Sequence, residues 1–443
     1  MILQNWWYTT LLAVDQPLCP PLRSHLTTEA LVVGAGMTGL SAALRLARSG
    51  RRVAIIELNI FGGSSTGRSA GFLTPDSELE LAQLVRRFGA DSARELWEAP
   101  VRGIREIVET VRRHDIPCDL QQQDSLFLGN GASGRAAIDE EVQARTALGF
   151  TQTRYGADEL PAVIGSRAFS GGVRYADCHG IDALLYAQGV KRVLLDLGVR
   201  IFESTESLAL DDHTVTTPLG SVTAEQIIFA IDKPAAALTP HAANVFHAQT
   251  FLSISEPLGD ADVRELFPDG PLQCWDSDLV YTYWRLTGDQ RLLVGGGSAL
   301  TTFNRHAVRS PRVIERVIAA LQARIPSLRR HRWIQYWPGL IDTTRDLLPT
   351  VLLDHEAPWV HWVLGCVGLP WAAFCGDLAA RQVLGALDPG EERYYHYFRP
   401  QRPFLVPLWA ERAAGKPLVF ALNNAWAKYV QVDGPSPGPA AQL

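Results

Sequence analysis

Three closely spaced glycines between two short apolar runs constrain the fold of this chain more than any other feature. The segment reads, in order, an apolar run at 30–33, the glycines Gly34, Gly36 and Gly39, a helical pattern ending at Gly50, a second apolar run at 51–56, and Glu57. Strand, glycine turn, helix, strand and acidic residue in this order are typical of a βαβ unit that binds a dinucleotide. A tight βα turn without a ligand is the alternative interpretation, and the acidic residue disfavours it.

The residue types of this unit suit a pyrophosphate. Gly34 allows a tight turn, Gly36 lets the backbone approach the phosphates, and Gly39 permits close packing of helix on strand. Met37 and Thr38 lie in the first turn of the predicted helix, where unpaired N–H groups and the helix dipole favour an anion.

Two further features bear on which dinucleotide is bound. Glu57 ends the second predicted strand, where a carboxylate accepts ribose hydroxyls and would repel a 2′-phosphate, so FAD or NAD is favoured. Segment 62–71 then reads GGSSTGRSAG, a run of small residues around one arginine. Such a loop offers N–H groups, hydroxyls and a guanidinium to a large anionic cofactor, with Ser64, Ser65, Thr66 and Arg68 as the candidate contacts. A flexible linker is the alternative interpretation of this loop.

Composition excludes several classes of protein. The 443 residues are 47% hydrophobic and 20% charged, which is typical of a globular chain of two to three domains. The net charge of −6 has no basic stripe, which argues against a nucleic-acid partner. The six cysteines form no C-x-x-C pair, so a disulfide framework, a zinc site and a thiol-redox motif are disfavoured, and we expect a cytoplasmic protein without a bound metal.

The fingerprint ending in Glu57, followed by the loop at 62–71, resembles the D-amino-acid oxidase / glycine oxidase / sarcosine oxidase superfamily of FAD enzymes. The similarity is nearest to its amine-oxidising, γ-glutamylputrescine oxidase-like branch, whose members have an aromatic N-terminal segment like 6–9 of this chain. The resemblance implies an α/β fold, with a discontinuous Rossmann-like FAD-binding domain and a substrate domain built on an antiparallel sheet. The implied division is an N-terminal arm at 1–27, an FAD-binding domain at 28–90, 170–240 and 335–390, a substrate domain at 91–169 and 241–334, and a C-terminal extension with a disordered tail at 391–443.

The resemblance also implies further contacts to non-covalently bound FAD. The strand near Leu208 corresponds to one that reaches the adenine. The segments around W-P-G at 337–339 and G-C-V-G-L-P at 365–370 resemble the family signature near the flavin ring, which implies contacts from Gly339, Gly365, Gly368, Leu369 and Pro370. Cys366 in the second segment suggests a thioether to the flavin, but the resembling covalent enzymes carry their cysteine earlier in the chain.

For the chemistry, the resemblance implies hydride transfer from the carbon next to an amine nitrogen to flavin N5. An aromatic wall would keep the amine neutral, and the candidates are Tyr281, Tyr283 and Trp371. Family members that act on free α-amino acids have an arginine where this chain has Ile341. We therefore expect an amine or an N-substituted amino compound as the small-molecule substrate.

Three alternatives stay open at this stage. An amino-acid oxidase or dehydrogenase would need Arg285 or Arg345 as its carboxylate clamp. The electron acceptor is either O2 or another molecule, because no lysine lies in the strand at 292–300 where the sarcosine oxidase type carries one. A flavin-binding protein without turnover is the third alternative.

The C-terminal extension of the chain contains two apolar runs, 403–409 and 418–422. These runs are consistent with a peripheral membrane contact, which would make the cytoplasmic protein membrane-peripheral. Packing on the protein's own surface or against a dimer partner is the alternative that we favour.

Overall fold

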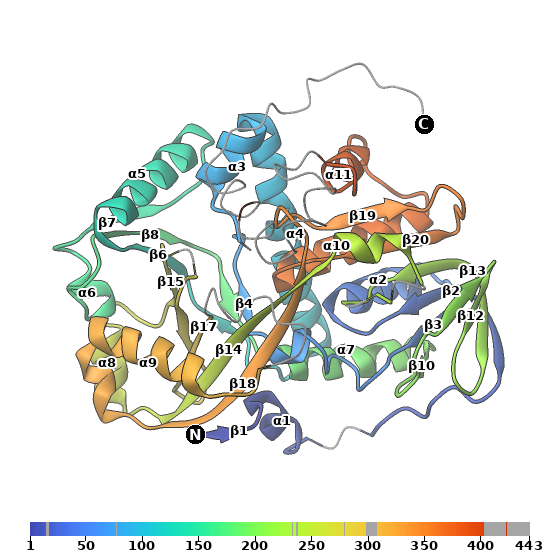
Figure 1. Cartoon of the computed structure of the whole chain (residues 1–443), viewed down its shortest axis with the longest axis horizontal. Coiled ribbons are helices and arrows are strands. Elements are labelled where there is room, and N and C mark those ends of the chain that lie inside the picture. Colours follow the sequence, from blue (N-terminus) through green and yellow to red (C-terminus); the bar gives the residue numbers. More distant parts are fainter. Residues whose placement is uncertain are drawn as a thin grey trace.

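Two large β-sheets lie side by side in this chain, with helices on their faces and between them (Figure 1). The computed structural model describes residues 1–14, 17–76, 78–232, 234–235, 238–278, 280–297, 308–402 and Leu422. The C-terminal extension beyond 402, with both of its apolar runs and the tail predicted to be disordered, lies outside the described residues apart from Leu422. The predicted α/β class is confirmed.

The eight-stranded sheet contains the predicted βαβ unit. Its strands are β10 (Arg200–Phe202), β3 (Val53–Ile56), β2 (His25–Val33), β13 (Ser221–Phe229), β12 (Thr214–Thr216) and β11 (Ala209–Asp211), together with β20 (Val360–Leu364) on β13 and β19 (Thr350–Leu353) on β20. Strands β3, β2 and β13 are parallel, and Val33 is the register partner of both Ile56 and Phe229. The carboxyl ends of these three strands therefore meet at one edge, where parallel α/β sheets bind their ligands.

The apolar runs in these strands are continuous because both faces of the sheet are buried. Val32 and Ile55 pack in one apolar cluster with helices α2 (Met37–Arg48) and α10 (Leu369–Val383), whereas Leu31 and Ala54 pack in another on the opposite face. This alternation follows from the two-residue period of a strand. The helix predicted from the glycine fingerprint is α2, and its N-terminus lies at the edge where the strands end.

The second sheet has nine strands and is mostly antiparallel. In order, it contains β1 (Ile2–Leu3), β18 (Trp333–Thr343), β14 (Phe246–Pro257), β17 (Arg291–Gly296), β16 (Tyr283–Leu286), β15 (Gln273–Asp276), β6 (Ser125–Gly129), β8 (Gly171–Tyr175) and β7 (Thr153–Gly156). Strands β16 and β17 form a hairpin in which Arg285 lies opposite Leu293. Two amphipathic helices are α4 (Ala90–His114) and α9 (Arg312–Arg324).

Sheet membership does not follow the predicted domain boundaries everywhere. Strand β18 falls in a segment assigned to the FAD-binding domain, but it pairs with β14 in the nine-stranded sheet. Strand β8 does the same by pairing with β6, and β1 of the predicted N-terminal arm is the parallel neighbour of β18. The division into two domains stays a prediction. The sheets differ from it near residues 170 and 335, where β8 and β18 belong to the nine-stranded sheet.

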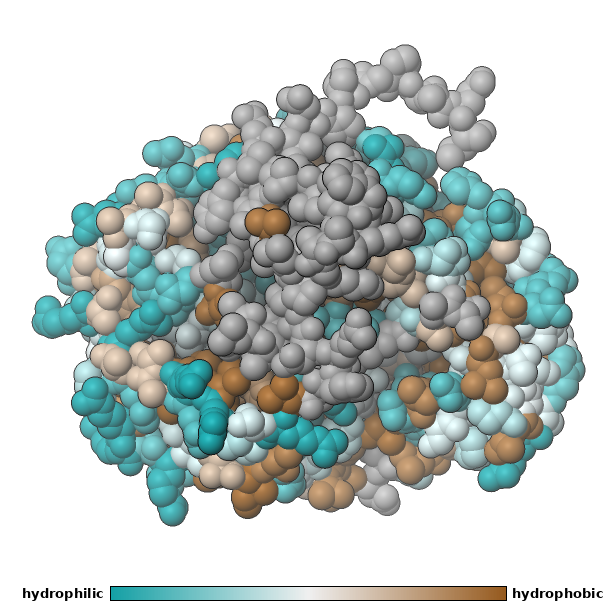
Figure 2. Space-filling view, in the orientation of Figure 1, coloured by the Kyte–Doolittle hydropathy of each residue, from teal (hydrophilic) through white to brown (hydrophobic). Residues whose placement is uncertain are grey.

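A small sheet and the remaining helices join the two large sheets. The small sheet consists of β4 (Phe72–Leu73), β9 (His179–Gly180) and β5 (Gln121–Gln122). The remaining helices are α1 (Trp6–Leu11), α3 (Leu81–Phe88), α5 (Gly131–Ala147), α6 (Pro161–Ile164), α7 (Ala183–Asp196), α8 (Asp260–Leu266) and α11 (Glu392–Tyr397). Among the described residues, no helix combines the length and the hydrophobicity that crossing a bilayer requires. On the face drawn in Figure 2, the hydrophobic residues outside the grey region lie in small separate areas among hydrophilic ones.

Candidate functional site

A groove of about 350 Å³ lies where strands β2, β3 and β13 end. Of the residues predicted to contact a cofactor, these line it: Gly34, Gly36, Met37, Thr38, Glu57, Ser64, Ser65, Thr66, Arg68, Gly365, Gly368 and Leu369. Residues from both ends of the sequence thus meet along a single surface. The groove has the position that a dinucleotide occupies in an open parallel sheet.

The glycine turn can be formed only by glycine at two of its positions. Gly34 has φ +100°, and a Cβ there would lie 2.3 Å from the Ala230 carbonyl oxygen. A Cβ on Gly39 would lie 1.9 Å from the Gly34 carbonyl oxygen, so Gly39 allows the helix to sit on the turn without itself lining the groove. The Met37 N–H donates to Thr66 Oγ1 at 2.9 Å, which fixes the first turn of α2 against the loop at 62–71.

Glu57 is held in place by the backbone around it. Its carboxylate accepts from the Ala35 N–H at 2.7 Å and from the Asn59 N–H at 2.8 Å, and the residue is 6% exposed. Burial raises the pKa of Glu57, and the two N–H donors oppose that shift. The carboxylate therefore lies at the groove with its orientation fixed by two hydrogen bonds.

The loop at 62–71 is supported from behind by the aromatic N-terminal segment. The Asn5 side-chain amide donates to the Gly67 carbonyl at 2.6 Å, Trp7 Nε1 to the Ser69 carbonyl at 2.8 Å, and the Tyr8 hydroxyl to the Gly63 carbonyl at 3.0 Å. Trp337 Nε1 adds a fourth contact, to the Arg68 carbonyl at 3.1 Å. The loop predicted to cradle a cofactor is thus held in one conformation rather than being a flexible linker.

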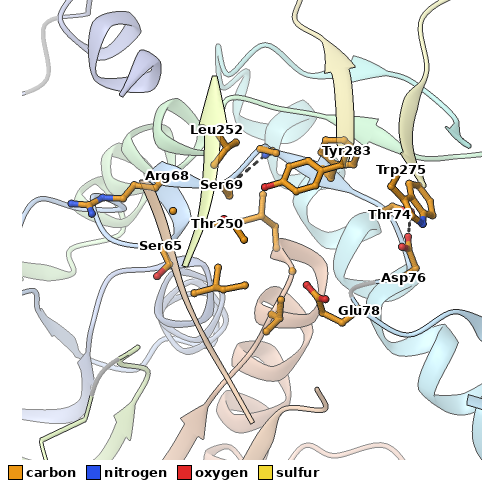
Figure 3. Close-up of a pocket in the computed structure, with 18 of the residues that line it drawn as sticks. Ser65, Arg68, Ser69, Thr74, Asp76, Glu78, Thr250, Leu252, Trp275 and Tyr283 are labelled. Atoms are coloured by element: carbon orange, nitrogen blue, oxygen red, sulfur yellow. Dashed lines mark hydrogen bonds between the residues drawn. The ribbon is translucent and has the colours of Figure 1, made fainter. Parts of the chain in front are cut away.

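A second cavity, of about 160 Å³, continues from the groove (Figure 3). The two share Ser65, Arg68, Ser69, Ile341, Val367, Gly368 and Leu369, and the predicted residues Gly339 and Pro370 line the second one. The guanidinium of Arg68 points away from Tyr283 and Glu78, whereas the Tyr283 hydroxyl and the Glu78 carboxylate point into the space between them. Its position next to the groove is the one expected for a substrate pocket beside a bound cofactor.

Two of the four predicted catalytic residues line this cavity. Tyr281 and Tyr283 face it with ring centroids 5.7 Å apart, and the Tyr281 hydroxyl donates to Glu78 Oε1 at 3.1 Å. Trp371 does not line it, because its ring packs edge-on against Phe398, with centroids 5.6 Å apart.

Arg285 is also placed outside the cavity. Its Nε donates to the Ala70 carbonyl and its Nη2 to the Ile181 carbonyl, both at 2.7 Å, and Nη1 reaches the Leu286 carbonyl at 3.2 Å. The side chain is completely buried, and burial lowers its pKa to about 10. Arg345, the other candidate for a carboxylate clamp, lies 5.6 Å from the ring centroid of Phe246 and lines neither cavity. Arg285 is therefore positioned to hold the backbone rather than a substrate, and Arg345 lies away from both cavities.

Sequence reasoning missed several polar or aromatic residues of the cavity, among them Asp76, Glu78, Thr250 and Trp275. Asp76 and Glu78 follow β4 in a segment without a motif, so no pattern singled them out. Trp275 also lies in a segment without a motif, and its position in β15 beside Tyr283 could have been found only from strand pairing. Thr250 is on β14 and shares a hydrogen bond with the Tyr283 hydroxyl.

Leu208, the predicted contact to the adenine, lies outside the groove. Leu208 is 45% exposed and lines neither cavity, whereas Thr205, Glu206 and Ser207 line the groove. The segment bends to the groove before β11 begins, and a strand boundary of this kind is not readable from periodicity.

The residues present fit a flavin dinucleotide. The groove offers a glycine turn open to close approach, the N-terminus of α2 and a buried acidic side chain at the strand end. The N-terminus of α10, which begins after Gly368 at φ +90°, lies where groove and cavity meet. A helix N-terminus there would stabilise negative charge on a reduced flavin ring.

Comparison with known proteins agrees with this geometry. Residues 29–382 match the family DAO, described as FAD dependent oxidoreductase. The chain is 27% identical over 412 residues to gamma-glutamylputrescine oxidoreductase of Escherichia coli (strain K12), covering 89% of this chain and 93% of that protein. It is 25% identical over 383 residues to the probable oxidoreductase OrdL of Haemophilus influenzae, covering 83% and 85%. The crystal structure of glycine oxidase from Geobacillus kaustophilus matches in fold with a TM-score of 0.74 at 17% identity, covering 85% of this chain and 99% of that one. The predicted cofactor and enzyme class are confirmed, and this chain belongs to the DAO family of FAD-dependent oxidoreductases.

Proposed function

We propose that this enzyme oxidises the C–N bond of an amine that arrives as a cation, forming an imine that water then hydrolyses to a carbonyl compound and a released amine. Bound FAD would supply the hydride acceptor. The chain's own residues bind the amine, orient it and exclude water. The name of the Escherichia coli relative, a gamma-glutamylputrescine oxidoreductase, is consistent with an amine substrate.

The observation that carries this proposal is the lining of the cavity of about 160 Å³ next to the groove. Two carboxylates, Asp76 and Glu78, line it together with the rings of Trp275, Tyr281 and Tyr283. Carboxylates and aromatic faces both favour a cationic nitrogen. A carboxylate on the substrate would instead be repelled by the two acidic side chains.

The arginines support the same choice. An amino-acid substrate needs a guanidinium that can grip its carboxylate in a bidentate way. Arg285 already donates to three backbone carbonyls, and the guanidinium of Arg68 points away from Glu78. The position equivalent to the family's clamp is Ile341, which lines the cavity as an apolar residue.

The test is the visible spectrum of the purified holoenzyme under anaerobic conditions, followed during addition of primary amines, secondary amines, diamines and amino acids. We expect amines to bleach the flavin band and neutral amino acids to leave it unchanged. Bleaching by amino acids alone would overturn the amine assignment, and bleaching by nothing in the panel would favour a flavoprotein without turnover. Admission of air then identifies the acceptor, since rapid recovery of the band indicates O2.

A further inference from the structure

An amine that enters as an ammonium must lose a proton before its C–N bond is oxidised, because an ammonium nitrogen has no lone pair. We propose that Asp76 accepts this proton. This inference rests on the proposed function. In the step, an N–H bond of the ammonium breaks, its electron pair stays on nitrogen, and an O–H bond forms on the Asp76 carboxylate. No electrons are gained or lost, and a pair of opposite charges becomes a neutral pair.

The position of Asp76 suits this role. Its side chain lines the cavity proposed for the amine and also a smaller, acidic cavity of about 50 Å³ that continues from it. Thr74 Oγ1 donates to Asp76 Oδ1 at 2.7 Å, so the carboxylate is held in one orientation (Figure 3). Trp275 lies beside it and lines both cavities. A cation that leaves the aromatic rings for the acidic side of the cavity would therefore meet Asp76.

The groups around Asp76 come from several elements. The titratable groups that act on Asp76 or line the acidic cavity with it are Glu78 on its own segment, Glu80 at the start of α3, Glu141 on α5, Tyr175 on β8, Cys178 before β9, Asp276 on β15, Asp278 after it, and Tyr281 before β16. Arg145 on α5 is paired with Glu141. Burial, with the nearby carboxylates of Glu141 and Glu78, raises the pKa of Asp76 to about 7, and the Thr74 hydrogen bond opposes that shift. A carboxylate with this pKa is ionised in part at neutral pH and forms a stable acid once protonated.

A hydrogen-bonded network behind Asp76 explains why a proton there is stable. Glu80 accepts from the Tyr175 hydroxyl at 2.7 Å and from Trp275 Nε1 at 2.9 Å, and the Tyr175 hydroxyl lies 3.3 Å from Glu141 Oε1. Burial raises the pKa of both Glu80 and Glu141. Burial and these neighbours all disfavour a negative charge on Asp76, and a proton delivered to Asp76 removes that cost.

The tyrosines of the cavity cannot take the same role. Burial raises the pKa of Tyr281 and Tyr283 above its usual range, so both hydroxyls keep their protons at neutral pH. They can donate to a substrate or to Glu78 but cannot accept the ammonium proton.

The first test detects the protonated carboxyl directly. Infrared difference spectra are recorded when the best amine of the panel binds to photochemically reduced holoenzyme, which cannot oxidise it, at a pH one to two units above 7. We expect the wild type to gain the carbonyl stretch of a carboxylic acid, Glu78→Gln to gain it too, and Asp76→Asn to lack it. Absence of the band in the wild type, or its persistence in Asp76→Asn, would overturn the proposal.

The second test is the pH profile of flavin reduction at low amine concentration. With ionised Asp76 and an ammonium substrate, the wild-type rate rises about tenfold per pH unit below about 7 and is level up to the pKa of the amine, near about 10. Asp76→Asn needs amine that is already neutral, so its rate continues to rise about tenfold per unit between pH 7.5 and 9. Asp76→Glu should restore part of the level region.

The two proposals fail in different ways. If no amine bleaches the flavin, the proposed function fails before Asp76 is tested. If amines bleach it but the profiles of wild type and Asp76→Asn coincide, only the role of Asp76 is wrong. Bound flavin in the visible spectrum checks that Asp76→Asn has folded. If it has not, the wild-type infrared band and the pH profile of Asp76→Glu together decide the matter.

Discussion

A single carboxylate at the end of β3 links the fold to the cofactor, because Glu57 accepts two backbone N–H groups and also lines the groove. Glu57→Gln keeps the shape but removes the charge and one of the acceptor oxygens. Since a hydrogen bond to a charged group contributes about 1.5–3 kcal/mol, we expect FAD to be held at least about tenfold more weakly. The ratio of flavin to protein absorbance after dialysis measures this. Exposed Glu225 on β13 supplies the control Glu225→Gln, which should keep full flavin.

Arg285 was a candidate for binding a substrate carboxylate, but in the fold it is buried and binds backbone carbonyls instead. Its guanidinium holds the carbonyls of Ala70, Ile181 and Leu286, and thereby ties the loop at 62–71 to β9 and β16. Arg285→Met should lower the free energy of unfolding by about 3 kcal/mol, because it leaves buried acceptors unsatisfied.

Denaturant unfolding of Arg285→Met and of the control Arg332→Met would measure this difference. The Arg332 side chain is 83% exposed in a salt bridge to Glu256, so its loss should change stability by less than about 1 kcal/mol. Flavin reduction per holoenzyme should be nearly the same in Arg285→Met as in the wild type. A large fall in that rate with unchanged stability would return Arg285 to the catalytic residues.

At the scale of elements, helix α10 depends on two close approaches to its neighbours. A Cβ on Gly376 would lie 2.1 Å from the Thr38 carbonyl oxygen of α2, and a Cβ on Gly103 of α4 would lie 2.0 Å from the Pro370 carbonyl oxygen. Gly376→Ala should therefore push α10 away from α2 and widen the groove between their N-termini. We expect a lower Tm and incomplete FAD occupancy, whereas Gly259→Ala, whose new Cβ has its nearest neighbour at 3.7 Å, should be unchanged in both.

Elements with strong local signals were the ones that the sequence could predict. The βαβ unit lies within a few residues of its expected position, because its glycine turn and helical periodicity are local signals. Leu208 and Trp371 line neither cavity, and the sequence could not show this, because the side that each residue presents depends on which other element packs against it. Asp76 and Glu78 carry no local signal, and only the fold brings them to Tyr281 and Tyr283.

At the scale of the whole molecule, the cofactor groove joins segments that are far apart in sequence. Its lining comes from residues within 33–38, 56–69, 205–207, 230–232, 341–342 and 363–372, and from Ala235 and Leu238. These segments include β18 of the nine-stranded sheet as well as the ends of β2, β3 and β13. A ligand that contacts all of these segments binds the folded chain but not the unfolded one. FAD should therefore stabilise the molecule by mass action, by about 2.7 kcal/mol at one hundred times its Kd.

Removal of FAD tests whether a ligand bound in the groove stabilises the two sheets as one unit. We expect the holoenzyme to unfold in one transition, and the apoprotein to unfold at a lower Tm that rises again as FAD is added back. The rise in Tm should be smaller in Glu57→Gln at the same FAD concentration, because a ligand that binds more weakly stabilises the folded chain less. If FAD left the Tm of the wild type unchanged, the groove at the ends of β2, β3 and β13 would not be its binding site, and the roles assigned to the glycine turn and to Glu57 would fail with it.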